Sequence, residues 1–284
     1  MTAPRRPDTA RPRQDVPESH EHGLPTADEL DAIEHQHAGR MAQSGAGVTH
    51  DDQLGVWWIR FEERTPQLAF AMRLRWPEDE AAERLARLTA TMRERGEWPS
   101  VSISDGLTLP PTIGETLAGA GWRIVAGERI MFTRHPPTNP HLDPTLRIEA
   151  VTPASAKECV ELEITNFGLP PSELESRAER LAETVRNGTE RAYIVRLMRK
   201  PVASARLIPG GQGTACLSGI NVVAAQRGRG YGRLVTSVAT RAGLATGSKL
   251  VWLSVDESNA PAVKLYESLG FEPTYAWSRW IAPA

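Results

Sequence analysis

Hydrophobic and polar positions along the chain alternate with two periods, and both periods occur in each half of the sequence. Runs with a period of two predict strands, and runs with a period near 3.6 predict amphipathic helices. In the second half these patterns predict strand 146–150, helices through about 187, strands 191–198, 201–209 and 214–223, a helix from about 232 to 246, strand 250–255, helix 260–269 and a final strand at 274–281. In the first half they predict a helix that begins near Thr26, strands 54–62 and 67–75, helix 77–88, strand 100–104, helix 111–120 and strand 123–133. This order of elements is typical of an α/β (α+β) fold.

Two proline-rich segments divide the chain. Residues 1–25 hold five prolines, four arginines and four acidic residues with almost nothing to bury, so we expect disorder there. Residues 135–144 hold four prolines, which predicts a stiff linker. We therefore expect a tail over 1–25, a first domain over 26–134, a linker over 135–144 and a second domain over 145–284.

The composition narrows the class of protein. The formal net charge of the 284 residues is −2, so there is no domain-scale basic excess that would favour nucleic acid as a partner. Two cysteines cannot form a disulfide framework, and the sequence shows neither a signal peptide nor an apolar run long enough to span a membrane. We therefore expect a cytoplasmic monomer or homodimer that binds neither nucleic acid nor membranes.

The strand predicted at 214–223 runs into a glycine-rich turn that opens the next helix. Gly228, Gly230 and Gly232 allow positive φ angles and a close approach to a ligand, and the first N–H groups of a helix lack intrahelical partners. Three arginines flank the same turn, namely Arg227, Arg229 and Arg233. This pattern predicts a site for a di- or triphosphate.

Two other interpretations of the glycine-rich turn remain open. One is a tight strand-to-helix turn that binds nothing, and the other is a dinucleotide-binding fold. The dinucleotide fold expects an acidic residue ~20 residues beyond the glycines, at the end of the next strand. Position 248 is serine in this chain, and no Walker signature follows the loop.

A second pattern lies downstream of the glycine-rich turn. It reads Asn259-x-x-Ala262-x-x-Leu265-Tyr266-x-x-x-Gly270-Phe271, and the first pattern reads Arg227-x-x-Gly230-x-Gly232. In this order and at this separation, the two motifs resemble the signatures of the GNAT superfamily of acyl-CoA-dependent N-acyltransferases. The resemblance covers about residues 146–284. The chain departs from the family pattern at Ala224, where a proline is common, and this change removes no ligand group.

The resemblance implies a fold, a reaction and a set of roles. The implied fold is two GNAT-like mixed-sheet domains in tandem, the second of which holds the acyl-CoA site. The implied reaction moves an acetyl group from acetyl-CoA, a co-substrate, to an amine by direct attack in a ternary complex, without a metal. The amine belongs to a small molecule or to a protein. The backbone of Val222 would contact the thioester oxygen, and Tyr266 would protonate the departing thiolate. The residues implied to bind the co-substrate are Val222, Val223, Arg227, Gly228, Arg229, Gly230, Tyr231, Gly232, Arg233 and Asn259.

The residue pattern alone leaves structural roles open for two of these residues. Tyr266 shares a predicted helix with Val263, Leu265 and Leu269, so it fits a packed tyrosine as well as a catalytic one. Asn259 alone predicts the N-cap of that helix.

The base that deprotonates the amine is constrained by composition. All seven histidines lie in the first 141 residues, so a carboxylate is the expected base. Asp256 and Glu257 end the strand nearest the acyl group, and Glu161 and Glu163 lie on the helix predicted at 153–166. We carry Asp256 and Glu163 as candidate bases, with a solvated charge as the alternative for each. Both cysteines, Cys159 and Cys216, sit among apolar neighbours, which predicts buried packing rather than a covalent thiol route.

The first half repeats the plan of the second without its chemistry. If Gly121-Trp122 is aligned with Gly270-Phe271, Leu117 stands where Tyr266 stands. The segment Trp76-Pro77-Glu78-Asp79-Glu80 replaces the glycine-rich turn, and its three acids would repel a pyrophosphate. We therefore predict a degenerate GNAT-like domain, with a plain α/β accessory domain as the alternative. For the whole chain, the alternatives to an enzyme are a non-catalytic acyl-CoA-binding regulatory or sensor module and, more distantly, a dinucleotide-dependent oxidoreductase.

Overall fold

A computed structural model describes residues 23–43, 46–61, 69–138 and 144–283. Most of the tail predicted over 1–25 and residues 139–143 of the predicted linker lie outside these ranges. The first half contains α1 (Ala27–Gln43), β1 (Ala46–Asp51), β2 (Val56–Phe61), β3 (Phe70–Met72), the 3₁₀ turn η2 (Glu78–Glu80), α2 (Ala81–Glu94), β4 (Ser100–Ser104), α3 (Ile113–Gly119) and β5 (Arg123–Thr133).

Over the described residues, the second half contains more helices than the first. It contains β6 (Leu146–Ala150), η3 (Pro153–Ser155), α4 (Ala156–Phe167), η4 (Pro171–Glu173), α5 (Leu174–Asn187), β7 (Arg191–Leu197), β8 (Lys200–Pro209), η5 (Gly211–Gly213), β9 (Thr214–Val222), η6 (Ala224–Gln226), α6 (Tyr231–Ala245), β10 (Leu250–Val255), α7 (Ala260–Glu267) and β11 (Glu272–Ile281). The strands predicted at 100–104, 123–133, 146–150 and 250–255 are confirmed at the residue level.

The structure of the first half departs from the sequence predictions at two strands, β1 and β3. Strand β1 was not predicted, because Ala46–Asp51 carries too few apolar residues to show a period of two. The strand predicted at 67–75 ends at Met72, since Arg73 adopts a left-handed conformation with φ of 58° that breaks the ladder.

Within the described residues, the strands form one mixed sheet of eleven strands that runs through both halves. Its order is β1-β2-β3-β4-β11-β5-β10-β9-β8-β7-β6. The pairs β3–β4 and β9–β10 are parallel, and the other neighbouring pairs are antiparallel. This is the mixed α/β fold that the sequence predicts.

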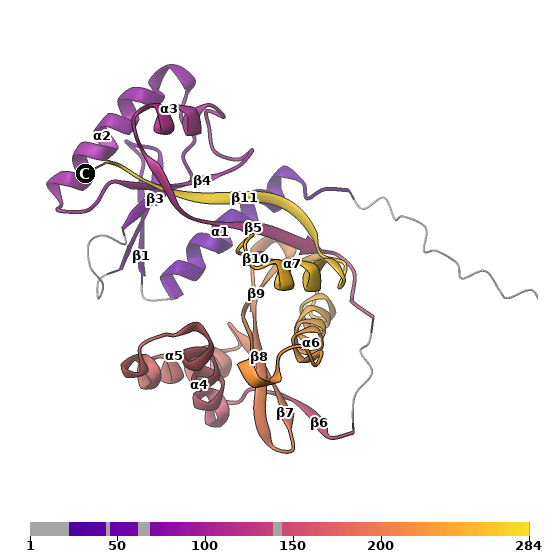
Figure 1. Ribbon diagram of the computed structural model, residues 1–284. Coiled ribbons are helices and arrows are strands. Elements are labelled where there is room, and N and C mark those ends of the chain that lie inside the picture. The colour runs from indigo at the N-terminus through magenta and orange to yellow at the C-terminus, as the bar shows by residue number, and fades with distance from the viewer. Residues whose placement is uncertain (1–22, 44–45, 62–68, 139–143, 284) are drawn as a thin grey trace, which may run out of the picture.

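The two halves exchange strands at the centre of this sheet. The last strand of the chain, β11, lies between β4 and β5 of the first half, and β5 lies between β11 and β10 of the second half. Figure 1 shows β11 and β5 running side by side across the middle of the molecule. Each half therefore completes the sheet of the other, and neither half has a closed set of strand pairs of its own.

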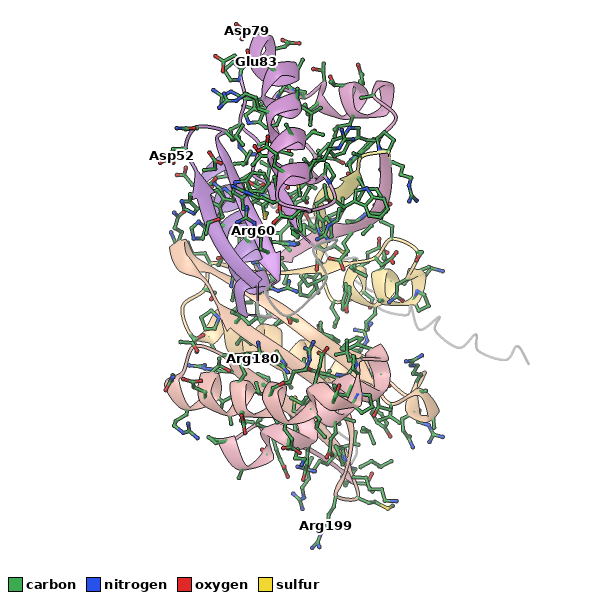
Figure 2. The ribbon with its side chains drawn as sticks, turned by 90° about the vertical axis from the view of Figure 1, so that its left-hand side faces the viewer. Asp52, Arg60, Asp79, Glu83, Arg180 and Arg199 are labelled. Carbon is green, nitrogen blue, oxygen red and sulfur yellow. The ribbon has the colours of Figure 1, made fainter. Side chains whose placement is uncertain are left out.

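Helices cover both faces of the sheet. Because side chains alternate along a strand, neighbouring residues of β10 enter different cores: Val251 and Leu253 pack with α6, and Trp252 packs with α1. Helices α4 and α5 form a third core against Ala192 and Ile194 of β7. The two halves extend in opposite directions, so that Asp79 and Arg199 mark the two ends of the molecule (Figure 2).

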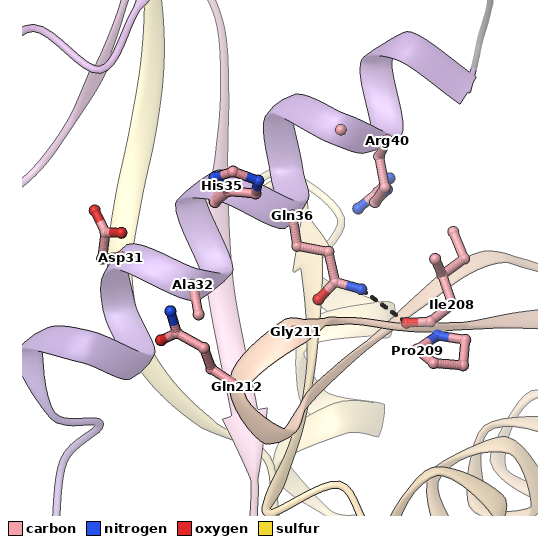
Figure 3. Close-up of a pocket in the computed structure, with 10 residues that line it drawn as sticks. Asp31, Ala32, His35, Gln36, Arg40, Ile208, Pro209, Gly211 and Gln212 are labelled. Atoms are coloured by element: carbon pink, nitrogen blue, oxygen red, sulfur yellow. Dashed lines mark hydrogen bonds between the residues drawn. The ribbon is translucent and has the colours of Figure 1, made fainter. Parts of the chain in front are cut away.

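Helix α1 joins the two halves by polar contacts as well as packing. The side chain of Gln36 donates from Nε2 to the carbonyl oxygen of Ile208 at 2.8 Å. Its Oε1 accepts from Trp252 Nε1 at 2.7 Å and from Thr214 Oγ1 at 3.1 Å. Figure 3 shows Gln36 reaching from α1 to the strand end that carries Ile208. This contact fixes the first helix of the chain over the central strands of the sheet.

Candidate functional site

Most of the predicted site residues line one cleft of about 640 Å³ between the end of β9, the start of α6 and helix α7. The lining residues are Asn166, Phe167, Ile220, Asn221, Val222, Gln226, Arg227, Gly228, Gly230, Tyr231, Gly232, Arg233, Asn259, Pro261, Ala262, Leu265 and Tyr266. Residues from both sequence motifs thus face the same space, although about 30 positions separate them in the chain.

The glycine-rich turn has the geometry of an anion cradle. Gly228 and Gly230 have φ angles of 77° and 84°, and a Cβ atom added at either one would meet nothing within 4 Å. The first α-helical hydrogen bond of α6 runs from Leu234 N–H to the carbonyl of Gly230. The N–H groups of residues 231–233 precede that bond, so they point out of the helix end beside two unobstructed glycines.

Strands β9 and β10 separate just before this cleft. They pair only from Thr214 with Leu250 to Cys216 with Trp252, and β9 continues to Val222 without pairing to β10. The N–H of Val223 donates to the carbonyl of Val202 on β8. Val222 is the next residue in that antiparallel ladder, so its own N–H and C=O point away from β8 and toward the gap.

Tyr266 both packs and lines the cleft. Its side chain belongs to the core beneath α6, 7% of its surface is exposed, and its ring lies 6.0 Å from that of Phe271. Burial raises the pKa of its phenol to about 12. The two roles left open by the sequence are therefore compatible, because a buried phenol that faces the cleft stays protonated and able to donate at neutral pH.

Asn259 caps α7. Its side-chain Oδ1 accepts from the N–H of Ala262 at 3.3 Å, and Pro261 occupies the first turn. The predicted N-cap is confirmed, and the exposed amide also lines the cleft.

The arginines of the turn differ in their surroundings. Arg227 donates from Nε to the carbonyl of Val222 at 3.3 Å, which ties the turn back to the strand end. Arg233 donates to Ser268 Oγ at 2.5 Å and so links α6 to the end of α7. Two residues of the predicted cofactor set, Val223 and Arg229, do not appear among the residues that line the cleft.

Sequence analysis missed three polar residues of the cleft. The Oε1 atom of Gln226 is buried and has no hydrogen-bond partner in the described structure. Asn166 donates from Nδ2 to Asn221 Oδ1 at 3.2 Å, and both residues line the cleft. The position of Gln226 directly before the motif arginine was a usable signal, whereas only the fold brings Asn166 to the end of β9.

The two candidate bases have different environments. Both oxygens of Glu163 accept from Arg206, at 2.5 and 2.6 Å, and burial raises the pKa of Glu163 although Arg206 opposes this shift. Asp256 is exposed, and hydrogen bonds from the side chain and backbone of Ser258 lower its pKa. Neither residue lines the cleft. The neighbouring Glu257 is paired with Arg129 at 3.0 Å.

Other reactive groups lie away from the cleft. Cys159 and Cys216 are free and buried, as predicted, and burial raises the pKa of their thiols to about 12 and about 11. No three His, Cys, Asp or Glu side chains within the described ranges are placed to hold a metal ion. A second cavity, of about 290 Å³, lies between α1 and the β8–β9 turn and contains none of the predicted site residues (Figure 3). None of the helices described is both long and apolar enough to cross a membrane.

Comparison with known families gives one match. The model of the Acetyltransferase (GNAT) family matches residues 157–271, a range that includes both motifs and all the residues that line the cleft. No curated protein matches the chain.

Solved structures match the fold of nearly the whole chain. A GCN5-related N-acetyltransferase from Kribbella flavida matches with a TM-score of 0.66 at 16% identity, over 89% of this chain and 96% of its own. A tandem GNAT protein from the clavulanic acid biosynthesis pathway matches with a TM-score of 0.63 at 16% identity, over 92% of this chain and 98% of its own. A GCN5-related N-acetyltransferase from Sphaerobacter thermophilus matches with a TM-score of 0.63 at 18% identity, over 81% and 78% of the two chains. The chain therefore has the fold of a tandem GNAT protein.

Proposed function

Because the second half of this chain belongs to the GNAT acetyltransferase family, we propose that the protein transfers an acetyl group from acetyl-CoA to an amine. The observation that carries this proposal is that three features line one cleft: the glycine-rich turn, the end of β9 that does not pair with β10, and Tyr266. Each of these parts serves a different portion of a thioester co-substrate.

The residues present fit acetyl-CoA. Open space over Gly228 and Gly230 leaves room for a diphosphate against the start of α6. The buried and unpartnered Oε1 of Gln226 offers an acceptor for a polar group of the bound arm. Where β9 and β10 separate, an extended arm can take the place of a missing strand, as the family resemblance implies.

The chain's own groups then account for the steps of the reaction. The thioester supplies an activated acyl group and a thiolate leaving group. The N–H of Val222, which points into the gap, holds the carbonyl oxygen as negative charge develops there. The amine nitrogen forms the new bond to the carbonyl carbon, the carbon–sulfur bond breaks, and Tyr266 delivers its proton to the sulfur.

The proposed acceptor is a small-molecule amine, which attacks the thioester carbonyl carbon directly in a ternary complex. The amine must shed a proton before it attacks or as it does so. Both carboxylate oxygens of Glu163 accept hydrogen bonds from Arg206, whereas the carboxylate of Asp256 is exposed to water. Of the two candidate bases we therefore favour Asp256. A proton relayed through water to Asp256 is consistent with its position after β10.

The test is thiol release from acetyl-CoA across a panel of small amines and peptides, with longer acyl-CoAs as controls. Turnover with at least one amine is expected, and Gly230→Asp should lower its rate about fivefold or more at acetyl-CoA concentrations near the KM of the unmodified protein. Binding of acetyl-CoA without turnover for any amine would instead favour an acyl-CoA sensor module. Binding of a dinucleotide but not of acetyl-CoA would contradict the family assignment of the site.

A further inference from the structure

Helix α4 carries two polar side chains, three residues apart, that reach the strands beside the cleft. Glu163 accepts two hydrogen bonds from Arg206 on β8, and Asn166 donates to Asn221 on β9. Residues three apart share one face of a helix, so both contacts are made by the same side of α4. Asn166 also donates to the carbonyl of Leu162 at 2.8 Å, which holds its amide in place.

Between these two contacts, β9 contains a bulge. Ser218 pairs with Arg206 and Asn221 pairs with Ser204, so two residues of β9 lie opposite the single residue Ala205. The first of them, Gly219, has a φ of 58°. The bulge lies where β9 has stopped pairing with β10 and shortly before Val222, so it sets the direction in which that strand end leaves the sheet.

The contacts from α4 fix both ends of the bulge. At one end, a Cβ atom at position 219 would lie 2.7 Å from Glu163 Oε1 and 3.4 Å from Arg206 Cγ, so the ion pair fits closely against the glycine. At the other end, Asn221 donates to Ser204 Oγ at 2.7 Å and to the carbonyl of Gly219 at 2.9 Å while it accepts from Asn166.

The ion pair is held on its far side as well. Arg206 donates from Nη1 to Glu190 at 3.3 Å, and Glu190 accepts from Thr184 Oγ1 at 3.1 Å. The side chains of Glu163, Arg206 and Glu190 are exposed by only 6%, 16% and 7%. A buried network with its partners satisfied has few alternative arrangements, so it transmits the position of α4 to the bulge.

We propose that Glu163 and Asn166 are positioning residues, which brace the Gly219 bulge from α4 and thereby hold the Val222 N–H where it meets the acyl carbonyl. This proposal rests on the proposed acetyl transfer, and it gives Glu163 a role different from that of a base. A small displacement of a positioned group is enough to slow a reaction about a hundredfold.

The experiment compares Glu163→Gln and Asn166→Ala with Glu179→Gln, which changes an exposed glutamate on α5. Asn166 is only half-buried, so its variant keeps the test usable if Glu163→Gln fails to fold. Three quantities are measured on each full-length protein. They are kcat and KM for acetyl-CoA over a range of pH, the affinity ratio of acetyl-CoA to CoA, and amide hydrogen exchange in peptides covering 217–223.

Both test variants should lower kcat by about tenfold or more, with KM for acetyl-CoA within about threefold of the unmodified protein. The pH–rate profile should keep its shape, and exchange in 217–223 should accelerate in the variants and not in Glu179→Gln. Loss of the acidic limb of the pH–rate profile in Glu163→Gln would make Glu163 the base and overturn the proposal. Unchanged kcat or unchanged exchange in folded Asn166→Ala would also overturn it.

Failure of the proposed function would give a different result. If the unmodified protein turns over no amine, hydrogen exchange and the affinity ratio still test the brace. If Glu163 and Asn166 hold the Val222 N–H against the acyl carbonyl, both variants should prefer acetyl-CoA over CoA less strongly than the unmodified protein does. An unchanged affinity ratio would contradict the proposal.

Discussion

Within the ranges that the structure describes, each half of the molecule contains one pair of parallel neighbouring strands that then separate, and only one of the two gaps stays open. In the second half, β9 and β10 part after three residue pairs, and the gap opens into the cleft. In the first half, β3 and β4 pair only at Ala71 with Val101 before they part. There the chain fills the gap itself.

The filling segment runs beyond β4. Leu109 donates its N–H to the carbonyl of Leu74 at 3.0 Å and accepts from the N–H of Trp76 at 3.1 Å. Leu109 thus bonds to the main chain that continues from β3, as a neighbouring strand would. A backbone that is already paired has no donor or acceptor to offer an extended ligand.

Outside these gaps the halves keep a common plan. Gly121 and Gly270 both have a φ of 82°, and the residue after each donates its N–H to the carbonyl five positions earlier: Trp122 to Leu117 and Phe271 to Tyr266. The proposed site therefore depends on local features, an unfilled gap, an open glycine turn and one phenol, and the shared fold alone does not supply it.

The largest expected effect comes from separating the halves. A fragment of residues 145–284 lacks β5, which lies between β10 and β11 and pairs with both. Two unpaired strand edges and an uncovered core should leave the fragment aggregated and without measurable turnover. Co-production with residues 1–134 is the control and should restore activity. A folded and fully active fragment, judged by circular dichroism and thiol release, would show that the strand exchange is dispensable.

The next effect tests the phenol that the first half replaces with Leu117. Tyr266→Phe keeps the packed ring and removes the proton donor, so kcat should fall by ~10²–10⁴-fold. Acetyl-CoA affinity, measured by calorimetry, should stay within about threefold because the glycine turn is untouched. Tyr193→Phe is the matched control, since Tyr193 packs against the same core without lining the cleft. If kcat is retained, Tyr266 serves packing alone.

A smaller effect is expected from the glycine turn. Gly230→Asp places a carboxylate in the space over the start of α6, so acetyl-CoA affinity should drop at least tenfold, ~1.4 kcal/mol. The substitution also strains a backbone with a φ of 84°. Gly247→Asp controls for this strain, because Gly247 has a φ of 97°, equally open surroundings and a place at the other end of α6. Equal affinities of the two variants would contradict a phosphate site at Gly230.

The sequence predicted the elements that carry the motifs because their patterns are local. Strand 250–255, the start of α6 and the cap at Asn259 follow from hydrophobic runs, glycine spacing and an Asn-x-Pro sequence. The family model agrees with the predicted GNAT resemblance, and the match to a solved tandem GNAT structure agrees with the predicted fold. The domain boundaries and the roles of individual site residues stay predictions.

The features that sequence analysis missed depend on contacts between distant parts of the chain. No local pattern indicates that β11 inserts between β4 and β5, because a strand's neighbours depend on the whole sheet. The same holds for Asn166, which meets Asn221 across 55 positions, and for Leu109, whose strand-like bonds follow no period of two. Sequence analysis named three acids that would repel a pyrophosphate in the first half, and it did not indicate that Leu109 pairs with the main chain beyond β3.

The smallest expected effect separates those two explanations of the first half. Calorimetry should give one acetyl-CoA per chain. The combined variant Glu78→Gln, Asp79→Asn, Glu80→Gln should leave that number unchanged, because Leu109 still pairs with Leu74 and Trp76. The three acids are exposed at an outer end of the molecule, where Figure 2 places Asp79, so their neutralisation should not disturb the fold or the cleft. A second site that appears only in the variant would show that charge excluded the ligand and that the filled gap did not. Two sites in the unmodified protein would remove the distinction between the halves altogether.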